Sequence, residues 1–322
     1  MLNSVHDRNR FARLFGVFVH PPISTRRLFL ASLVGVFVGF WPAVAAEPKV
    51  EAPPTSAAQS VTGSLVIVGG GGLPDSIRDR FVQLGGGKKG RLVVIPTASD
   101  LADDARIERI HSYWESMGFG SVKMLHTHDP KQADEPSFVK PLTEATAAWM
   151  SGGDQSRLAS AYRGTAVERE LRRLVARGGV VGGTSAGAAV MSAIMITGGS
   201  TQARVGQGFG LLPEDVVIDQ HFQNRKRQKR LLGVLASHPR CLGLGIDEQT
   251  ALVVCGHRFT VVGRANVSIC MPPSDRDKDS ITLLKDGEAG DLLQLTRSLM
   301  SRLKVPGTSK PLLSKTTSAT TP

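Results

Sequence analysis

The segment that most constrains the fold is residues 180–191, Val-Val-Gly-Gly-Thr-Ser-Ala-Gly-Ala-Ala-Val-Met. The two valines are typical of the end of a buried strand, the paired glycines allow a turn too tight for a Cβ, and the small residues that follow favour a helix packed against a sheet. We therefore expect a strand, a turn and a helix, with Ser185 at the apex. Such a turn exposes the hydroxyl and directs the free N–H groups of the helix start toward any negative charge that forms beside it.

Residues 183–187 also fit the G-x-S-x-G pattern of a nucleophile elbow. In that interpretation Ser185 is the nucleophile, and the N–H of Ala186 helps to form an oxyanion hole. The alternative is a Gly-rich connection with an incidental serine, which many parallel α/β folds contain. Catalysis therefore requires a base, an acid and a pocket from the rest of the chain.

Around this turn, apolar runs alternate with amphipathic segments, which predicts an α/β fold with a mostly parallel sheet. Strands are expected at 64–68, 91–96, 122–125, 145–150, 216–222 and 242–248. Helices are expected at 75–84, 100–117, 155–163, 167–177 and 223–235, with a weak one at 289–303. Runs at 251–255, 258–262 and 265–270 predict an antiparallel extension of the sheet.

The first 45 residues have the composition of an export signal. Arg26 and Arg27 precede Leu-Phe-Leu as in a twin-arginine signal, an apolar stretch follows to about residue 41, and residues 43–45 are small enough for cleavage. A membrane anchor or a buried helix is the alternative, but the run is short for a bilayer span of about 20 residues. We expect a signal peptide at 1–45, a disordered linker at 46–60, a catalytic domain at 61–304 and a disordered tail at 305–322. The mature protein would then lie in the periplasm or outside the cell, without a membrane span.

The net charge and the cysteines limit the kinds of ligand and of structural site that the chain can have. The net charge is +11, and removal of the five arginines and one aspartate of residues 1–45 leaves about +7 spread over a whole domain, which favours anionic ligands over a nucleic-acid arm. The three cysteines contain no C-x-x-C pair, so neither a zinc site nor a disulfide framework is expected. Cys255 and Cys270 flank neighbouring expected strands and are a conceivable pair, but the favoured role for these two and for Cys241 is that of small buried hydrophobes.

Two further features do not indicate a cofactor site. The glycines at 69–72 lack the Lys-Ser/Thr ending of a phosphate loop, and they suit a backbone that passes close to the Ser185 turn or to a substrate. His126 and His128 follow an expected strand, but no further ligand stands near them in the sequence. We therefore expect this pair to face solvent rather than a metal.

Polar residues at the ends of other strands supply partners for Ser185. His221 comes at the end of the strand at 216–222, and Glu248 ends the strand at 242–248. Because a parallel sheet gathers strand ends at one edge, His221 is expected to accept the serine proton and Glu248 to orient the imidazole. The turn at 152–155, Gly-Gly-Asp-Gln, would face them, with the N–H of Asp154 as a second oxyanion donor. Asp154 also suits the N-cap of the helix that follows, and the two roles are compatible.

The expected helix at 223–235 carries Arg225, Arg227 and Arg230 together with two lysines. One interpretation is a nucleic-acid patch, but no aromatic residues are interleaved with these cations. A solvated basic face is another.

Four motifs taken together resemble the cyanophycinase family, serine hydrolases in the same peptidase family as aspartyl dipeptidase. They are Gly-Gly-Asp-Gln at 152–155, Gly-Gly-Thr-Ser-Ala-Gly-Ala at 182–188, Asp-Gln-His-Phe at 219–222 with the arginines that follow, and Gly-Ile-Asp-Glu at 245–248. The resemblance extends from about residue 64 to about residue 270. It implies a three-layer α/β/α fold like that of class I glutamine amidotransferases. It also implies hydrolysis of cyanophycin, a poly-aspartate with arginine joined to each side-chain carboxyl, to β-Asp-Arg dipeptides.

The resemblance implies roles for individual residues. Ser185 takes the role of nucleophile, His221 that of base and Glu248 that of the third member of the triad. The implied substrate contacts are Gln155, Asp219, Gln220, Arg225, Arg227 and Arg230. Arginines suit the free α-carboxylate of each arginyl branch because they bind carboxylates in bidentate fashion, whereas Lys226 and Lys229 are expected to face solvent.

An acyl-enzyme route needs neither a metal nor an organic cofactor. Relatives suggest a homodimer. The export signal departs from the intracellular members of the family and implies action on polymer released by other cells.

Three other functions stay open on the sequence. A relative that cleaves isoaspartyl or α-aspartyl peptides fits the same motifs. An α/β-hydrolase-type esterase shares G-x-S-x-G but would use an acid that precedes its histidine, such as Asp247 with His257. An exported binding protein for anionic polymers would use the arginines without catalysis.

Overall fold

A computed structural model of the chain describes residues 63–272 and 281–303. The expected signal peptide, linker and C-terminal tail lie outside these residues. The strands of the main sheet, in chain order, are β1 (Ser64–Val68), β2 (Arg91–Ile95), β3 (Ser121–Met124), β4 (Ala147–Met150), β5 (Val180–Thr184), β10 (Thr250–Cys255), β11 (Arg258–Gly263) and β14 (Ala289–Asp291).

The main sheet is parallel at one end and antiparallel at the other. Its eight strands are ordered β14-β11-β10-β1-β5-β4-β2-β3. Five neighbouring strands, β1, β5, β4, β2 and β3, pair in parallel. On the other side of β1, strands β10, β11 and β14 continue the sheet in antiparallel fashion. Strands β1, β4 and β5 are buried along their whole length and β2 everywhere except at Arg91, as their apolar sequences predict, whereas the edge strand β3 is only partly buried.

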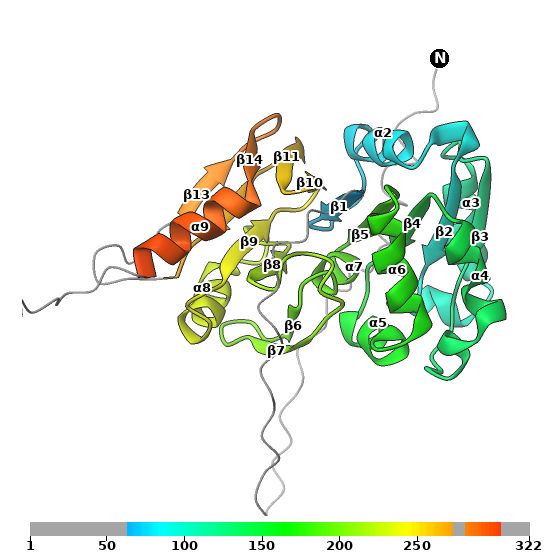
Figure 1. Ribbon diagram of the computed structural model, residues 1–322, viewed down its shortest axis with the longest axis horizontal. Helices are drawn as coiled ribbons and strands as arrows, with labels where there is room; N and C mark the ends of the chain where they lie inside the picture. The colour runs from blue at the N-terminus through cyan, green and yellow to red at the C-terminus, as the bar shows by residue number, and fades with distance from the viewer. Residues whose placement is uncertain (1–62, 273–280, 304–322) are drawn as a thin grey trace, which may run out of the picture.

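Helices cover both faces of this sheet (Figure 1). In chain order, the α-helices of the described residues are α2 (Asp75–Leu84), α3 (Ile107–Glu115), α4 (Pro136–Glu144), α5 (Gln155–Tyr162), α6 (Ala166–Ala176), α7 (Ala186–Ala189), α8 (Gln228–Ser237) and α9 (Leu292–Leu303). Leu65 and Ile67 of β1 pack in one apolar cluster with residues of α4, α5 and α6, whereas Val66 and Val68 pack in another with residues of α2 and α3. The predicted three-layer α/β/α fold is confirmed.

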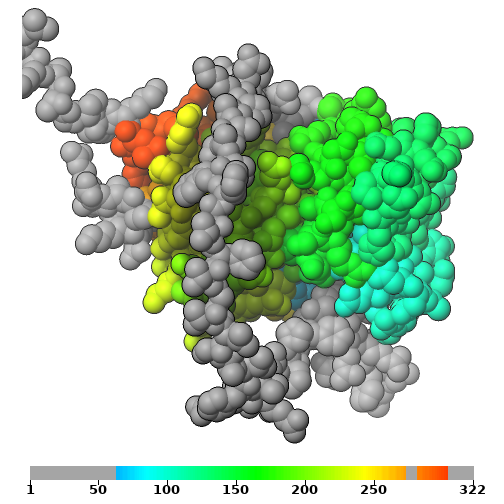
Figure 2. All heavy atoms as spheres, turned by 90° about the horizontal axis from the view of Figure 1, so that it is seen from below, coloured from blue at the N-terminus to red at the C-terminus, as the bar shows by residue number. Residues whose placement is uncertain are grey.

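A second sheet completes the domain. Its strands are β8 (Val216–Gln220), β9 (Leu242–Ile246), β12 (Val267–Cys270) and β13 (Ile281–Leu284), in the order β13-β12-β9-β8. The pair β8–β9 is parallel, and β12 runs antiparallel to β9. A hairpin of β6 (Ile194–Gly198) and β7 (Arg204–Gln207) comes between α7 and β8 in the sequence. In both views the cyan and green first half of the domain lies beside the yellow and orange second half (Figures 1 and 2).

Several expected elements differ from the structure. The expected helix at 100–117 is a 3-10 turn, η2 (Asp100–Asp103), followed by α3, because Asp104 is extended and its carboxylate accepts the N–H of Arg106. The expected helix at 223–235 begins only at Gln228, because Lys226 has a positive φ of 52° and the preceding residues form a turn. The expected antiparallel extension divides between two sheets, β13 was not predicted, and residues 289–291 form strand β14 ahead of α9.

The cysteines are free, and no helix in the two described ranges combines the length and apolar character needed to cross a bilayer. Cys241 and Cys270 are buried as predicted, but the prediction for Cys255 is wrong. Cys255 ends β10 at the turn into β11 and is exposed, with its Sγ 3.0 Å from Ser64 Oγ.

Candidate active site

Ser185 lies at the apex between β5 and α7, as the glycine pattern predicts. Its backbone is strained, with φ 52° and ψ −105°, a conformation that costs a non-glycine residue roughly 1–3 kcal/mol. Two contacts maintain it. The N–H of Ser185 donates to the carbonyl of Val68, 3.0 Å away, and Gly183 and Gly187 pack so closely that a Cβ on Gly183 would meet the carbonyl of Gly187 at 2.5 Å.

His221 and Glu248 reach Ser185 from the ends of β8 and β9. The Oγ of Ser185 lies 2.8 Å from Nε2 of His221, and Nδ1 of His221 lies 2.6 Å from Oε1 of Glu248. A neutral imidazole that donates its Nδ1–H to Glu248 presents a lone pair at Nε2 to the serine hydroxyl. The three side chains therefore form one hydrogen-bonded chain in the order that a nucleophile, a base and an orienting acid require.

Backbone strain is concentrated around these three residues. Among the described residues, the non-glycine positions with positive φ are Ser185, His221, Lys226 and Gln249. The N–H of His221 donates to Gly69 O at 2.8 Å, and the N–H of Gln249 donates to Gly70 O at 2.7 Å. Strain of this kind persists only where the surroundings hold it, and it is typical of functional sites.

The glycine run at 69–72 packs directly against the acid and base. A Cβ on Gly70 would lie 2.6 Å from Nε2 of His221, and one on Gly71 would lie 2.7 Å from Oε2 of Glu248. The run therefore makes the close approach that its sequence predicts, although the groups approached are the imidazole and the carboxylate.

The surroundings keep the His221 imidazole neutral. Burial, together with the positive charge of Arg225, lowers the pKa of His221 to about 4 against the opposing attraction of Glu248. Only 4% of its side chain is exposed. At neutral pH the imidazole is therefore unprotonated and able to accept a proton from Ser185.

A cavity of about 290 Å³ opens beside Ser185. Its lining residues are Gly153, Asp154, Gln155, Ser185, Thr197, Gly198, Gly199, Gln220, Arg225, Arg227 and Arg230. The β6 end, Thr197 to Gly199, was not predicted as part of the site, because nothing in its sequence indicates that the hairpin folds back over the strand ends. The cavity is polar and positively charged.

The three arginines of the cavity have different environments. Arg230 is 3% exposed and forms a two-pronged ion pair with Asp219, and its Nη1 donates to Gly199 O at 2.5 Å. Arg227 donates to both the backbone carbonyl and the side-chain Oε1 of Gln220, each at 2.6 Å. Arg225 is exposed at the cavity, and the two lysines of the segment, Lys226 and Lys229, are exposed as predicted.

Asp219 does not take the predicted place of a substrate contact. Its side chain is fully buried, and both carboxylate oxygens bond to Arg230. It is absent from the lining of the cavity, because it points into the protein beneath the arginines. Asp219 therefore positions Arg230, since a buried carboxylate needs such a partner.

The turn after β4 provides part of the cavity but not the expected oxyanion donor. The N–H of Asp154 donates to Ala98 O at 2.9 Å, so the prediction of Asp154 as an oxyanion donor is wrong. The carboxylate of Asp154 caps α5 through the N–H of Ser156 at 2.8 Å. Gln155 donates to Ile196 O at 2.8 Å, which ties the turn to β6. Ala186 opens α7, where N–H groups have no partner within the helix.

The geometry excludes the esterase arrangement. Asp247 is buried and accepts the N–H groups of Gln223 and Asn266, while His257 pairs with Asp291 at 3.0 Å. The histidine in contact with Ser185 is His221.

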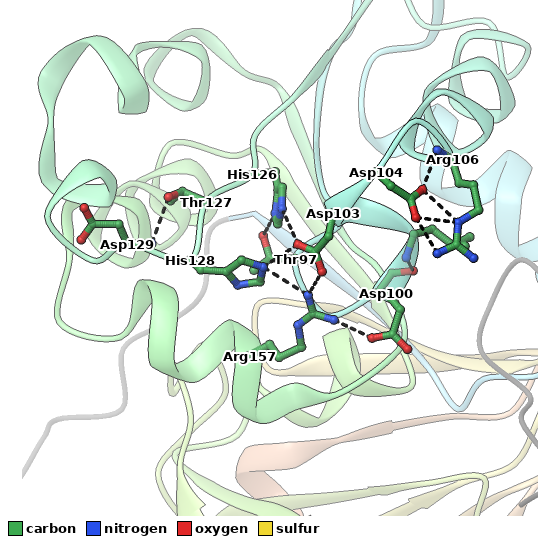
Figure 3. A network of polar contacts seen from close by, with 12 residues as sticks. Thr97, Asp100, Asp103, Asp104, Arg106, His126, Thr127, His128, Asp129 and Arg157 are labelled. Atoms are coloured by element: carbon green, nitrogen blue, oxygen red, sulfur yellow. Dashed lines mark hydrogen bonds and ion pairs between the residues drawn. The ribbon is translucent and has the colours of Figure 1, made fainter.

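His128 is exposed as predicted, whereas His126 is partly buried. Asp103, at the end of η2, lies against both of them, with its Oδ1 3.2 Å from Nε2 of His126 and 2.6 Å from Nε2 of His128 (Figure 3). The expectation that no further ligand stands near the pair is wrong. The spacing in the sequence did not indicate this contact, because Asp103 lies in the connection after β2 and the two histidines lie in the connection after β3.

Known proteins are similar to this chain in sequence. The profile of Peptidase family S51 matches residues 65–262. The cyanophycinase of Synechococcus elongatus is 38% identical over 216 residues, which cover 63% of this chain and 66% of that protein. The cyanophycinase of Geminocystis herdmanii is 36% identical over 226 residues, which cover 66% of this chain and 81% of that protein.

A solved structure is similar to this chain in fold. The crystal structure of a peptidase from an acI-B1 Actinobacterium superposes with a TM-score of 0.56 at 26% identity, covering 73% of this chain and 98% of that one. Residues 65–262, which the family profile matches, contain Ser185, His221 and Glu248. The chain therefore belongs to peptidase family S51, and its similarity to cyanophycinases agrees with that assignment.

Proposed function

We propose that the chain is an exported serine-type exopeptidase that hydrolyses cyanophycin to β-Asp-Arg dipeptides through an acyl-enzyme on Ser185. The observation that carries the proposal is the Ser185–His221–Glu248 chain at a cavity lined by three arginines. The similarity to cyanophycinases supports the choice of substrate.

In the proposed reaction His221 accepts the proton of Ser185 as Oγ attacks the scissile carbonyl. Glu248 stabilises the imidazolium that forms, and the N–H of Ala186 donates to the oxyanion. His221 then gives the proton to the leaving amine, which breaks the peptide bond and leaves an ester on Ser185. Water, deprotonated by the same imidazole, hydrolyses that ester and restores the serine.

Substrate recognition follows from the charges of the cavity. Each arginyl branch of the polymer carries a free α-carboxylate and a guanidinium. Arg225 is the exposed arginine of the lining and is assigned to the carboxylate, while Arg227 and Arg230, held by Gln220 and Asp219, keep the cavity positive. Asp154 supplies an acidic group in the lining for the guanidinium.

The proposal includes export. The paired Arg26 and Arg27, the apolar stretch to about residue 41 and the small residues at 43–45 support a twin-arginine route to the periplasm or the medium. An exported enzyme would act on polymer released by other cells.

The test is dipeptide release from insoluble cyanophycin by the chain from residue 46 onward, beside its Ser185→Ala variant. We expect β-Asp-Arg from the wild type and none above background from the variant. Turnover of short isoaspartyl peptides without release from the polymer would replace cyanophycin by the dipeptidase alternative. Polymer binding without turnover by either protein would favour a binding function.

A further inference from the structure

A second polar cluster lies outside the cavity, at the connections after β2 and β3 (Figure 3). Asp103 comes from η2, and His126 and His128 follow β3. The ligand atoms of the three side chains, one carboxylate oxygen and two Nε2 atoms, all lie within 4.8 Å of one another. We propose that Asp103, His126 and His128 bind a divalent first-row transition metal such as zinc.

The donor set fits that chemistry. Two imidazoles and one carboxylate are a common protein donor set for zinc and its neighbours, whereas calcium and magnesium prefer oxygen ligands alone. Tetrahedral ligands at about 2.0–2.1 Å from zinc lie about 3.4 Å from one another. The Asp103–His126 separation of 3.2 Å is close to this value, and the 2.6 Å Asp103–His128 separation must open slightly. Three protein ligands leave one position for water.

A second set of contacts holds the ligands in place. Nδ1 of His126 lies 2.9 Å from Thr97 Oγ1, which in turn lies 2.6 Å from the hydroxyl of Tyr162. That hydroxyl accepts the N–H of Thr127 at 3.1 Å, so the tyrosine fixes both the threonine and the chain between the two histidines. Ligating histidines usually bond through their other ring nitrogen in this way, which fixes the ring orientation.

Asp103 divides its two oxygens between different partners. Its Oδ1 faces both histidines, while its Oδ2 bonds to Arg157, whose Nη1 also donates to Asp100 at 2.6 Å. Oδ1 can thus bind a metal while Arg157 stays on Oδ2. A metal must replace the hydrogen bonds between Oδ1 and the two Nε2 atoms, together with the 3.1 Å contact of Arg157 with Nε2 of His128.

The cluster is also open to solvent. The Asp103 and His128 side chains are 42% and 49% exposed, which leaves a route for the ion from solvent.

The test uses the untagged full chain after chelator treatment and dialysis, titrated with zinc in a calorimeter. We expect one zinc per chain. His128→Gln should weaken binding by at least about 100-fold, and Thr97→Val, which removes an outer partner, by roughly 10–100-fold. The matched control is His257→Gln, which removes an equally exposed histidine that pairs with Asp291 elsewhere, and it should leave the affinity unchanged.

Thermal unfolding supplies a second readout. At zinc concentrations about 100-fold above Kd, the wild type and the His257→Gln control should unfold roughly 5–10 °C higher, and His128→Gln should not. Magnesium and calcium should give no shift. Asp103→Asn is the substitute if His128→Gln does not fold.

Three results would overturn the proposal. The first is the absence of stoichiometric zinc binding by the wild type, and the second is equal binding by the wild type and the ligand variants. The third is a thiolate-to-metal charge-transfer band in the cobalt(II) complex, which would place the metal on the exposed Cys255 instead.

Discussion

Two histidine–carboxylate pairs follow parallel strands of this domain, and their hydrogen bonds have the same length. His221 and Glu248 are joined at 2.6 Å, as are His128 and Asp103. The His221 side chain is 4% exposed and contacts a serine hydroxyl, whereas that of His128 is 49% exposed and shares its carboxylate with a second imidazole. Burial and the third partner, rather than the pair itself, therefore decide whether a histidine–carboxylate pair suits proton transfer or metal binding.

Removing the buried imidazole should have the largest effect. We expect His221→Ala to lower kcat by about 10⁶-fold, because the serine then lacks its base. Steady-state hydrolysis of cyanophycin measures it. The half-exposed His257→Gln, which breaks a histidine–carboxylate pair away from Ser185, should retain wild-type activity. Similar losses in the two variants would show that the loss does not depend on contact with Ser185.

The carboxylate of the buried pair should matter almost as much. Glu248→Gln retains the shape of the side chain but removes the charge that orients the imidazole, so kcat should fall by about 10⁴-fold. A loss under 10-fold would show that Glu248 does not orient His221. Circular dichroism of the variant controls for folding.

Beneath the cavity, the buried ion pair should control stability. Arg230→Met leaves Asp219 buried without its main partner and should lower the free energy of unfolding by about 3–5 kcal/mol. Urea denaturation gives this value. The matched control Arg169→Met breaks a pair whose side chains are about half exposed and should cost about 1 kcal/mol or less. Equal costs would contradict the role of Asp219.

The smallest effect is on the pH profile. With the pKa of His221 at about 4, kcat/KM should rise with pH through that value, since only the neutral base accepts a proton. Arg225→Gln removes a charge that lowers this pKa, so the rising limb should move to higher pH. Lys226→Gln, which removes a neighbouring exposed cation, is the control. A rise centred near 6.5 in the wild type would contradict the buried, neutral imidazole.

The sequence predicted those parts of the fold and site that depend on local patterns. The continuous apolar runs predicted the parallel strands, and the turn at 183–187 predicted the position of Ser185. His221 and Glu248 were expected beside Ser185 because the strand ends were assigned to one parallel sheet. The structure places β8 and β9 in a second sheet, and the residues still meet Ser185 because the ends of these strands are hydrogen-bonded to the glycine run after β1.

Contacts between distant segments could not be predicted in this way. Asp219 and Gln220 both lie at the end of β8, so the sequence predicted the same role for both. Because side chains alternate along a strand, that of Asp219 points into the protein, where it bonds to Arg230. The N–H of Asp154 donates to the carbonyl of Ala98, which is 56 residues earlier in the sequence. The β6 hairpin reaches the cavity only through tertiary packing. Asp103 joins His126 and His128 from another connection for the same reason.

The most direct test of the central claim is to label the chain with diisopropyl fluorophosphate and locate the adduct by mass spectrometry. We predict one label per chain, on the peptide that contains Ser185, and almost none in His221→Ala because the serine then lacks its base. A label on a different serine, or equal labelling of wild type and His221→Ala, would contradict the assignment of Ser185 as a nucleophile activated by His221.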